Sequence, residues 1–144
     1  MSEKKKPKKV FMPGPILPEK IANSIASHQS KTDISEHNIF LAQVKEDLTD
    51  TGAIRALDFD ANEESLESIL YDIREGAFAK FDLSCLHMYH SLGEVNVGEI
   101  YFFVFTSSPS REVASEACDY LVKEFRLKVK VSTETIHAVD DQNN

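Results

Sequence analysis

Four basic side chains near the end of the sequence are the residues best suited to binding an anion. Arg126, Lys128 and Lys130 alternate with apolar residues, which predicts that the three share one face of a strand. Arg111 begins the helical segment that leads into this strand. Basic groups near a helix N-terminus suit an anionic ligand, because the free N–H groups also stabilise negative charge. The alternative is an ordinary solvated strand face.

Other catalytic signatures are absent from the sequence. It contains no glycine-rich phosphate loop, no HExxH motif and no GxSxG motif. His87 and His90 are three residues apart on an expected strand, so their side chains point to opposite faces and cannot easily share a metal ion. Cys85 and Cys118 each lie in an apolar segment, which is typical of buried thiols. We therefore predict neither a metal site nor a disulfide.

The elements that must position these residues follow from hydrophobic periodicity. It predicts strands over residues 10–12, 38–45, 54–59, 80–90, 99–106 and 126–134, and helices over residues 18–28, 60–76 and 108–125. A turn is expected around Gly93. The strand over residues 99–106 is apolar on both faces and is expected to be the most buried.

Capping signals predict where the two long helices begin and end. Asp60 with Glu63 forms a pair that resembles a capping box, and Gly76 is a natural stop. Ser108 is the expected N-cap of the last helix, with Pro109 at its first position. Two long amphipathic helices against a mixed or antiparallel sheet predict an α+β fold.

Composition and charge indicate a folded domain in the cytoplasm. The 144 residues are 42% hydrophobic and 28% charged, with a net charge of −8. Five lysines and one glutamate give residues 1–9 a charge of +4, which leaves −12 on the rest and argues against a nucleic-acid surface. No apolar run approaches the roughly 18 residues that span a membrane, and no secretory signal is present. We expect one domain over residues 10–138 and disordered tails over residues 1–9 and 139–144.

A family resemblance adds to this interpretation. Residues 90–99, with the sequence HSLGEVNVGE, resemble the HRxGxxxxGE motif of the large, catalytic subunit of molybdopterin synthase, the MoaE family. Residues 107–121 look like the strand end, S-x-H-R turn and A-F-E-A helix of that family. Residues 40–45 and 56–60 are similar to its upstream strands. The resemblance extends over about residues 35–136.

The resemblance implies an α/β hammerhead fold, a homodimer and a transferase activity. In that family each large subunit receives the Gly-Gly tail of a small ubiquitin-like partner, which carries sulfur as a thiocarboxylate. The sulfur passes to a cyclic pyranopterin phosphate and forms the dithiolene of molybdopterin. The phosphate-bearing compound is a substrate, so no bound cofactor is implied.

The resemblance also assigns site residues one position at a time. The arginine of the V-R strand falls on Lys45, and the histidine and arginine of the H-R turn fall on Ser110 and Arg111. The helix-end lysine falls on Arg126, and the second lysine falls near Thr133. Both family lysines are thus replaced, and an arginine does not readily give up a proton. The resemblance implies Lys45, Arg111 and Arg126 as substrate-binding residues, of which Arg126 is the catalytic candidate. Lys128 and Lys130 do not match the family by position, and we add them to the predicted substrate-binding residues because they lie close and are basic.

Three functions are compatible with these residues. The first is an active synthase subunit, a sulfurtransferase. The second is a non-catalytic homologue that acts as a dimeric binding module for the ubiquitin-like partner. The third is a stand-alone α+β protein that shares only the fold.

Overall fold

The computed structural model describes residues 9–138, so the tails predicted at residues 1–9 and 139–144 lie outside the described residues except for Lys9. The strands are β1 (Phe11–Pro13), β2 (Glu36–Gln43), β3 (Leu48–Thr49), β4 (Gly52–Asp60), β5 (Cys85–Asn96), β6 (Ile100–Ser108) and β7 (Ser132–His137). The helices are α1 (Pro18–His28), α2 (Glu63–Lys80) and α3 (Arg111–Lys128). The predicted order of elements is confirmed, with β3 as one additional short strand. No helix among residues 9–138 is long and apolar enough to cross a membrane.

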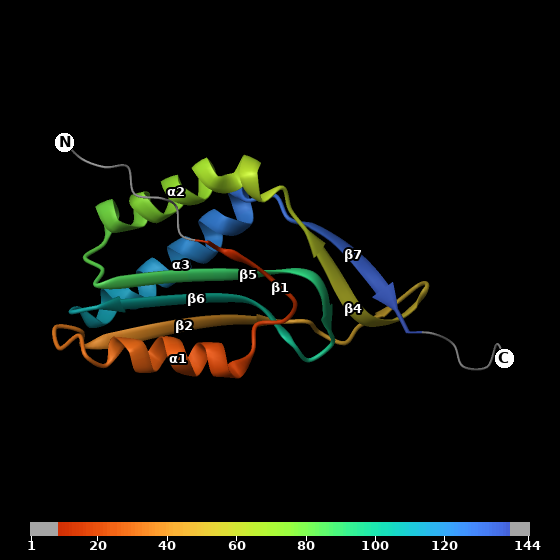
Figure 1. Ribbon diagram of the computed structural model, residues 1–144, viewed down its shortest axis with the longest axis horizontal. Helices are drawn as coiled ribbons and strands as arrows, with labels where there is room; N and C mark the ends of the chain where they lie inside the picture. Colours follow the sequence, from red (N-terminus) through yellow and green to blue (C-terminus); the bar gives the residue numbers. More distant parts are fainter. Residues whose placement is uncertain (1–8, 139–144) are drawn as a thin grey trace.

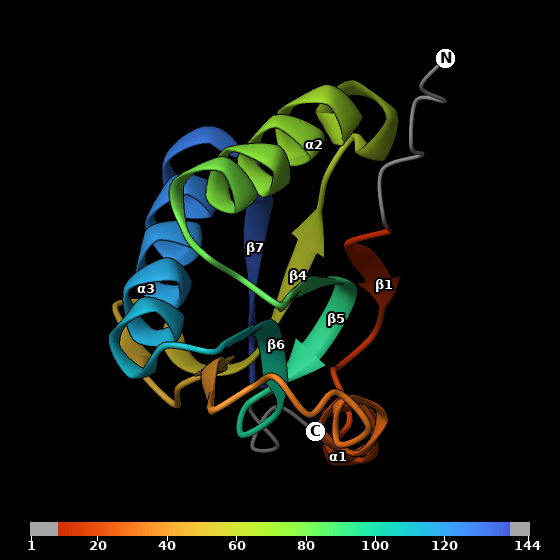
Figure 2. The ribbon, with the colours of Figure 1, turned by 90° about the vertical axis from the view of Figure 1, so that its left-hand side faces the viewer.

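The strands form one mixed sheet with the central order β2-β6-β5-β4-β3. Neighbouring strands on this path are antiparallel, whereas β1 adds to β5 in parallel and β7 adds to β4. Helices α2 and α3 cover one face of the sheet, and α1 covers the opposite face (Figures 1 and 2). The strands β4 and β7 extend beyond this layered part (Figure 1). The α+β prediction is therefore confirmed.

Strand β6 lies at the centre of the core, as its apolar sequence predicts. Phe102 and Val104 belong to the large apolar cluster beneath α2 and α3. Phe103 and Phe105 face the other way and pack in the smaller cluster beneath α1. All four are at most 1% exposed. Burial on both faces is what a strand covered by helices on both sides requires.

Helix α2 differs from its predicted boundaries at both ends. Its N-cap is Asn62, whose side chain accepts a hydrogen bond from the backbone N–H of Ser65. Gly76 does not end the helix, which continues to Lys80. A Cβ at Gly76 would lie 3.5 Å from the hydroxyl of Tyr120 on α3, so this glycine lies where the two helices approach each other. Gly76 is therefore an interior residue of α2, and the helix stop predicted at this residue is wrong.

The turn predicted around Gly93 is instead a bend within β5. The first half of β5 pairs with β6, and residues 93–96 pair with β4. Gly93 has a φ of 86°, a value that residues with a side chain rarely adopt. The bend lets one long strand change partners, and it carries the chain from the layered part of the fold to β4.

Candidate functional site

The C-terminal end of α3 positions Arg126, so the predicted start of the last strand at residue 126 is wrong. The helix continues to Lys128, and only Ser132–His137 form a strand. Val122, Phe125 and Val129 are buried and follow helical spacing, whereas Leu127 is 77% exposed. Burial every three or four residues stabilises a helix, and this outweighs the alternation that follows Phe125. Arg126 and Lys128 therefore share the last helical turn and not a strand face.

Arg111 and Arg126 do not converge within one chain. Arg111 is the first residue of α3, so Arg126 lies about 22 Å further along the helix. The guanidinium of Arg111 is 3.2 Å from the carboxylate of Glu36, and its side chain is 87% exposed. A surface ion pair of this kind contributes little to stability. Any joint action of Arg111 and Arg126 requires a second chain.

The other predicted basic residues do not line the pocket that Arg126 lines. Lys128 forms a 2.7 Å ion pair with Glu124 and lines a groove between α2 and α3. The pKa of Lys128 is raised by the hydrogen bond and the negative charge of Glu124. Lys45 is exposed just after β2, and Lys130 is exposed between α3 and β7. Of the five predicted residues, only Arg126 lines the pocket at the end of α3.

This pocket, which we call the Arg126 pocket, lies between the end of α3 and the strands β4, β5 and β6. Its volume is about 350 Å³. The guanidinium of Arg126 lies over the ring of Phe40 at 5.2 Å from the centroid. Phe40 does not line this pocket, and together with Arg126 it lines a neighbouring groove between β2 and α3. Most of the lining is apolar, namely Leu57, Phe59, Tyr101, Phe102, Phe125, Val129 and Val131, and the polar members are His90, Arg126 and Thr133.

Two positions that the family resemblance singled out meet in this pocket. Arg126 is on α3 and Thr133 is on β7, yet both contribute to the lining. These are the positions at or near which the family resemblance predicts two lysines. A single permanent cation in a largely apolar pocket can hold a phosphate or carboxylate, but it cannot serve as a general base.

His90 forms the buried wall of the pocket as a neutral imidazole. It is 5% exposed and stacks on Phe125 at 5.4 Å between centroids. Its Nδ1 lies 2.8 Å from the carbonyl oxygen of Ser91, which can only accept, so Nδ1 carries the proton. Burial lowers the pKa of His90 below the ordinary histidine value, the hydrogen bond to Ser91 opposes this shift, and the charge of Arg126 adds to it.

The lowered pKa of His90 predicts a loss of stability in acid. The unfolded chain binds a proton near pH 6.5, whereas the folded chain resists it, so the free energy of unfolding falls as the pH drops below that value. For one group the slope reaches at most about 1.4 kcal/mol per pH unit. Denaturant unfolding at pH values between 7.5 and 5.5 measures this slope of the free energy of unfolding against pH. His90→Phe should flatten the slope and His137→Gln should not; equal slopes in all three proteins would contradict the assignment.

The remaining residues of the 90–99 motif shape the backbone. Gly98 has a φ of 90° in the turn between β5 and β6. The carboxylate of Glu99 accepts a 2.8 Å hydrogen bond from the backbone N–H of Asn96 and closes this turn. Glu94 is exposed and pairs with Arg55 on β4 at 3.3 Å. The motif therefore builds the bend and turn that hold His90 and Tyr101 in the pocket wall.

Sequence reasoning missed one cluster. His87 and His90 do point to opposite faces of β5, as predicted, but His87 meets His28 and Cys85 on the α1 side. Both cysteines are buried, again as predicted. The signal in the sequence is the Cys-x-His spacing, which puts Cys85 and His87 on one strand face. The contribution of His28 depends on tertiary packing that the sequence does not reveal.

The fold is that of solved molybdopterin synthase structures. Molybdopterin synthase from Staphylococcus aureus matches with a TM-score of 0.76 and 19% identity, over 90% of each chain. The protein–protein complex of subunits 1 and 2 of the molybdopterin-converting factor from Helicobacter pylori matches with a TM-score of 0.74 and 19% identity, over 92% of this chain and 90% of the other.

Sequence comparison defines the family. The model of the MoaE protein family matches residues 15–128. The molybdopterin synthase catalytic subunit of Caulobacter vibrioides is 31% identical over 108 residues, which are 75% of this chain and 69% of that protein. The chain belongs to the MoaE protein family, and the resemblance drawn from residues 90–121 is confirmed.

Proposed function

We propose that this chain acts in molybdenum cofactor biosynthesis as a large-subunit component of a molybdopterin synthase. The observation that carries the proposal is the meeting of Arg126 and Thr133 in one pocket, next to the buried wall formed by His90. The family match over residues 15–128 supports the same assignment. The proposed site of action is the cytoplasm.

In this proposal the Arg126 pocket holds a cyclic pyranopterin phosphate. The guanidinium of Arg126 pairs with the phosphate through two parallel N–H donors, and the aromatic walls pack against the pterin rings. A small ubiquitin-like partner presents the thiocarboxylate of its Gly-Gly tail. The thiocarboxylate sulfur displaces an oxygen substituent on the pterin precursor and forms a thioester. Water then hydrolyses the thioester, so the sulfur stays on the precursor and the tail leaves as a carboxylate. The solved two-subunit complex of the Helicobacter pylori factor supports an assembly of this kind.

A non-catalytic binding module is the second candidate, and one observation favours it. Among the described residues that line the Arg126 pocket, none is a lysine. A lysine can act as a nucleophile or exchange a proton, whereas an arginine remains charged. If the reaction needs an amine at the position of Arg126 or Thr133, this chain binds the partner and the precursor without turnover.

One reconstitution separates these candidates. The purified chain is mixed with a thiocarboxylated small subunit and the cyclic precursor, and both molybdopterin formation and complex formation are measured. Product above background supports the synthase. Complex formation without product supports the binding module, and no complex at all would leave only a shared fold.

We further propose a homodimer with shared sites. Arg111 lies about 22 Å along α3 from Arg126 within one chain, so these two predicted site residues could act together only across two chains. We expect Arg111→Ala and Arg126→Ala each to abolish product formation. Mixing the two variants under conditions of subunit exchange should restore about one quarter of the wild-type sites, since half of the dimers are mixed and each mixed dimer has one intact site.

The mixing experiment has two outcomes that would contradict shared sites. Full activity of Arg111→Ala alone would remove Arg111 from the site. Two inactive variants that regain no activity on mixing, although a pull-down through an affinity tag on one variant shows mixed dimers, would place both residues in sites that one chain completes. Unmixed variants, incubated in the same way, are the controls.

A further inference from the structure

Three potential metal ligands meet on the face of the sheet that α1 covers. His28 is the last residue of α1, Cys85 is the first residue of β5, and His87 follows two positions later. The Sγ atom of Cys85 lies 2.6 Å from Nε2 of His28 and 3.2 Å from Nε2 of His87. The two Nε2 atoms are 3.2 Å apart. Three donor atoms from two elements therefore form a compact triangle.

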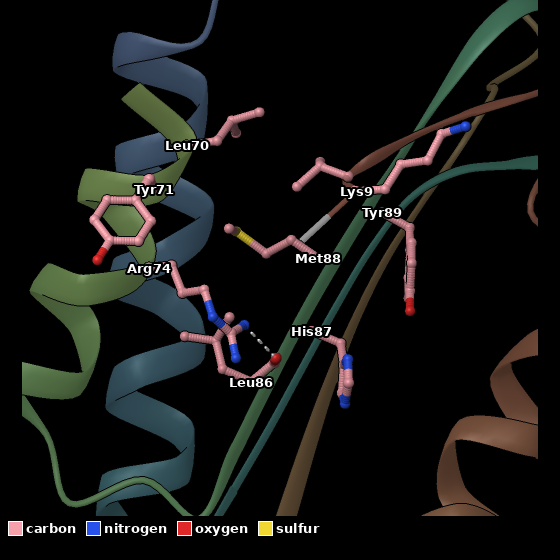
Figure 3. A pocket seen from close by; sticks show the side chains of 9 residues that line it. Lys9, Leu70, Tyr71, Arg74, Leu86, His87, Met88 and Tyr89 are labelled. Atoms are coloured by element: carbon pink, nitrogen blue, oxygen red, sulfur yellow. Dashed lines mark hydrogen bonds between the residues drawn. The ribbon is translucent and has the colours of Figure 1, made fainter. Parts of the chain in front are cut away.

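The alternation of β5 explains why this triangle is separate from the Arg126 pocket. Leu86 and Met88 point toward α2 and α3, whereas His87 and Tyr89 point to the other side of the strand (Figure 3). Cys85 shares the side of His87, because side chains two apart lie on one face. His90 faces the opposite side and lines the Arg126 pocket. The two groups of polar residues are thus divided by the sheet.

His28 is oriented as a metal-binding histidine usually is. Its Nδ1 is hydrogen-bonded to the backbone carbonyl oxygen of Ser24, one turn earlier in α1. A carbonyl oxygen only accepts, so Nδ1 carries the proton and Nε2 presents its lone pair toward Cys85. A second ring nitrogen that donates to a carbonyl is the supporting interaction that fixes the ring of a metal ligand. His28 and Cys85 are 6% and 7% exposed, so water competes little for these atoms.

The donor set and the size of the triangle fit a zinc ion. Tetrahedral zinc with imidazole and thiolate ligands keeps the ligand atoms about 3.3–3.6 Å apart. The two contacts of His87 are close to this range, and the contact between His28 and Cys85 would open by about 1 Å. One thiolate with two imidazoles favours zinc over magnesium or calcium, which prefer oxygen ligands.

The structure assigns a binding site for a zinc-class divalent ion to His28, Cys85 and His87. Binding displaces the thiol proton of Cys85 and links the end of α1 to the start of β5. Three protein ligands leave a fourth position for water or another small ligand. The groove along α1, lined by Ser24, Ser27, His28 and His87 among others, gives access from solvent.

Titration with metal ions tests the assignment. The full chain, freed of metal by a chelator, is titrated with Zn²⁺ by calorimetry and with Co²⁺ by absorption spectroscopy. We expect one equivalent to bind and a thiolate-to-cobalt charge-transfer band to appear. Cys85→Ser and His87→Gln should each weaken binding by at least about 100-fold, more than the loss of a supporting hydrogen bond costs. The charge-transfer band should vanish in Cys85→Ser.

Cys118→Ser is the matched control, because Cys118 is buried to a similar degree and lies outside the triangle. It should retain both the stoichiometry and the band. Saturating Zn²⁺ should raise the unfolding temperature of wild type and Cys118→Ser by at least about 5 °C, and that of Cys85→Ser by less. His87 is only partly buried, so His87→Gln tests the site if Cys85→Ser fails to fold. Equal Zn²⁺ affinity in wild type and His87→Gln, or a cobalt complex without the band, would overturn the assignment.

Discussion

Replacing Arg126 by alanine is expected to lower molybdopterin formation by about 100-fold or more, or to lower precursor affinity by a similar factor if the chain only binds. Arg126 is the one cation that lines the described pocket, and the rest of the lining is mostly apolar. Loss of a preorganised donor to a developing or fixed negative charge typically costs two to three orders of magnitude, because the surrounding pocket offers no replacement for the lost charge. Rates of product formation and a precursor titration measure the two quantities.

Two further variants sharpen the test of Arg126. Lys123→Ala is the matched control, because Lys123 lies on α3, pairs with Asp119 at the surface and does not line the Arg126 pocket. Lys123→Ala should change neither the rate of product formation nor the affinity for the precursor by more than about twofold. Arg126→Lys introduces the residue that the family resemblance predicts there. A faster reaction than wild type would show that an amine is needed, whereas a slower one would show that the bidentate fork of arginine is used. An Arg126→Ala variant with unchanged rate and affinity would exclude the pocket as the site.

The fold followed from local signals wherever one signal dominated. β6 is apolar at nearly every position from Ile100 to Phe105, and only a strand covered on both faces accommodates such a run. Helix α1 was predicted with its bounds, since Pro18 and the apolar spacing of Ile21 and Ile25 agree. In these segments propensity and tertiary packing favour the same structure.

The errors occurred where two local signals compete. Residues 126–131 alternate like a strand, but they also continue the helical stripe of Leu121 and Phe125. The packing of Phe125 and Val129 against the core favours the helix, which therefore continues to Lys128. Gly76 carries the signal of a helix stop, yet α2 continues through it to Lys80, and Gly76 lies at the contact with Tyr120 of α3. Such contacts are tertiary and are not encoded in a local window.

The candidate sites show the same division. The family resemblance brought Arg126 and the position of Thr133 to attention, but their convergence depends on β7 crossing to β4, and this long-range pairing was not predicted in detail. The cluster of His28 with Cys85 spans 57 residues in sequence. Strand alternation could pair Cys85 with His87, whereas the packing of α1 on the sheet is needed to supply His28. Pairwise spacing finds ligands on one element, and only the fold adds the third.

Phe125→Ala is expected to be the most destabilising single change near the Arg126 pocket. The Phe125 ring is 3% exposed, packs on Phe102 at 4.6 Å between centroids and stacks on His90 at 5.4 Å. Truncation of a buried phenylalanine costs about 3–5 kcal/mol, because transfer energy is lost and a cavity remains. A domain of this size has about 5–15 kcal/mol of total stability, so the variant is expected to be marginally folded. Urea unfolding measures the change in the free energy of unfolding. The comparison requires that the slope of this free energy against urea concentration is the same in wild type and variant.

Leu127→Ala is the matched control, because it removes an apolar side chain two residues away on the same helical turn. Leu127 is 77% exposed, so its loss leaves no cavity and should change the free energy of unfolding by less than about 0.5 kcal/mol. The contrast depends on α3 remaining helical to Lys128. On a strand that began at Arg126, Leu127 and Val129 would share the buried face, and truncation of Leu127 would then cost about 2 kcal/mol or more. A large effect of Leu127→Ala would therefore contradict the helix end, and with it the position of Arg126 in the lining of the pocket.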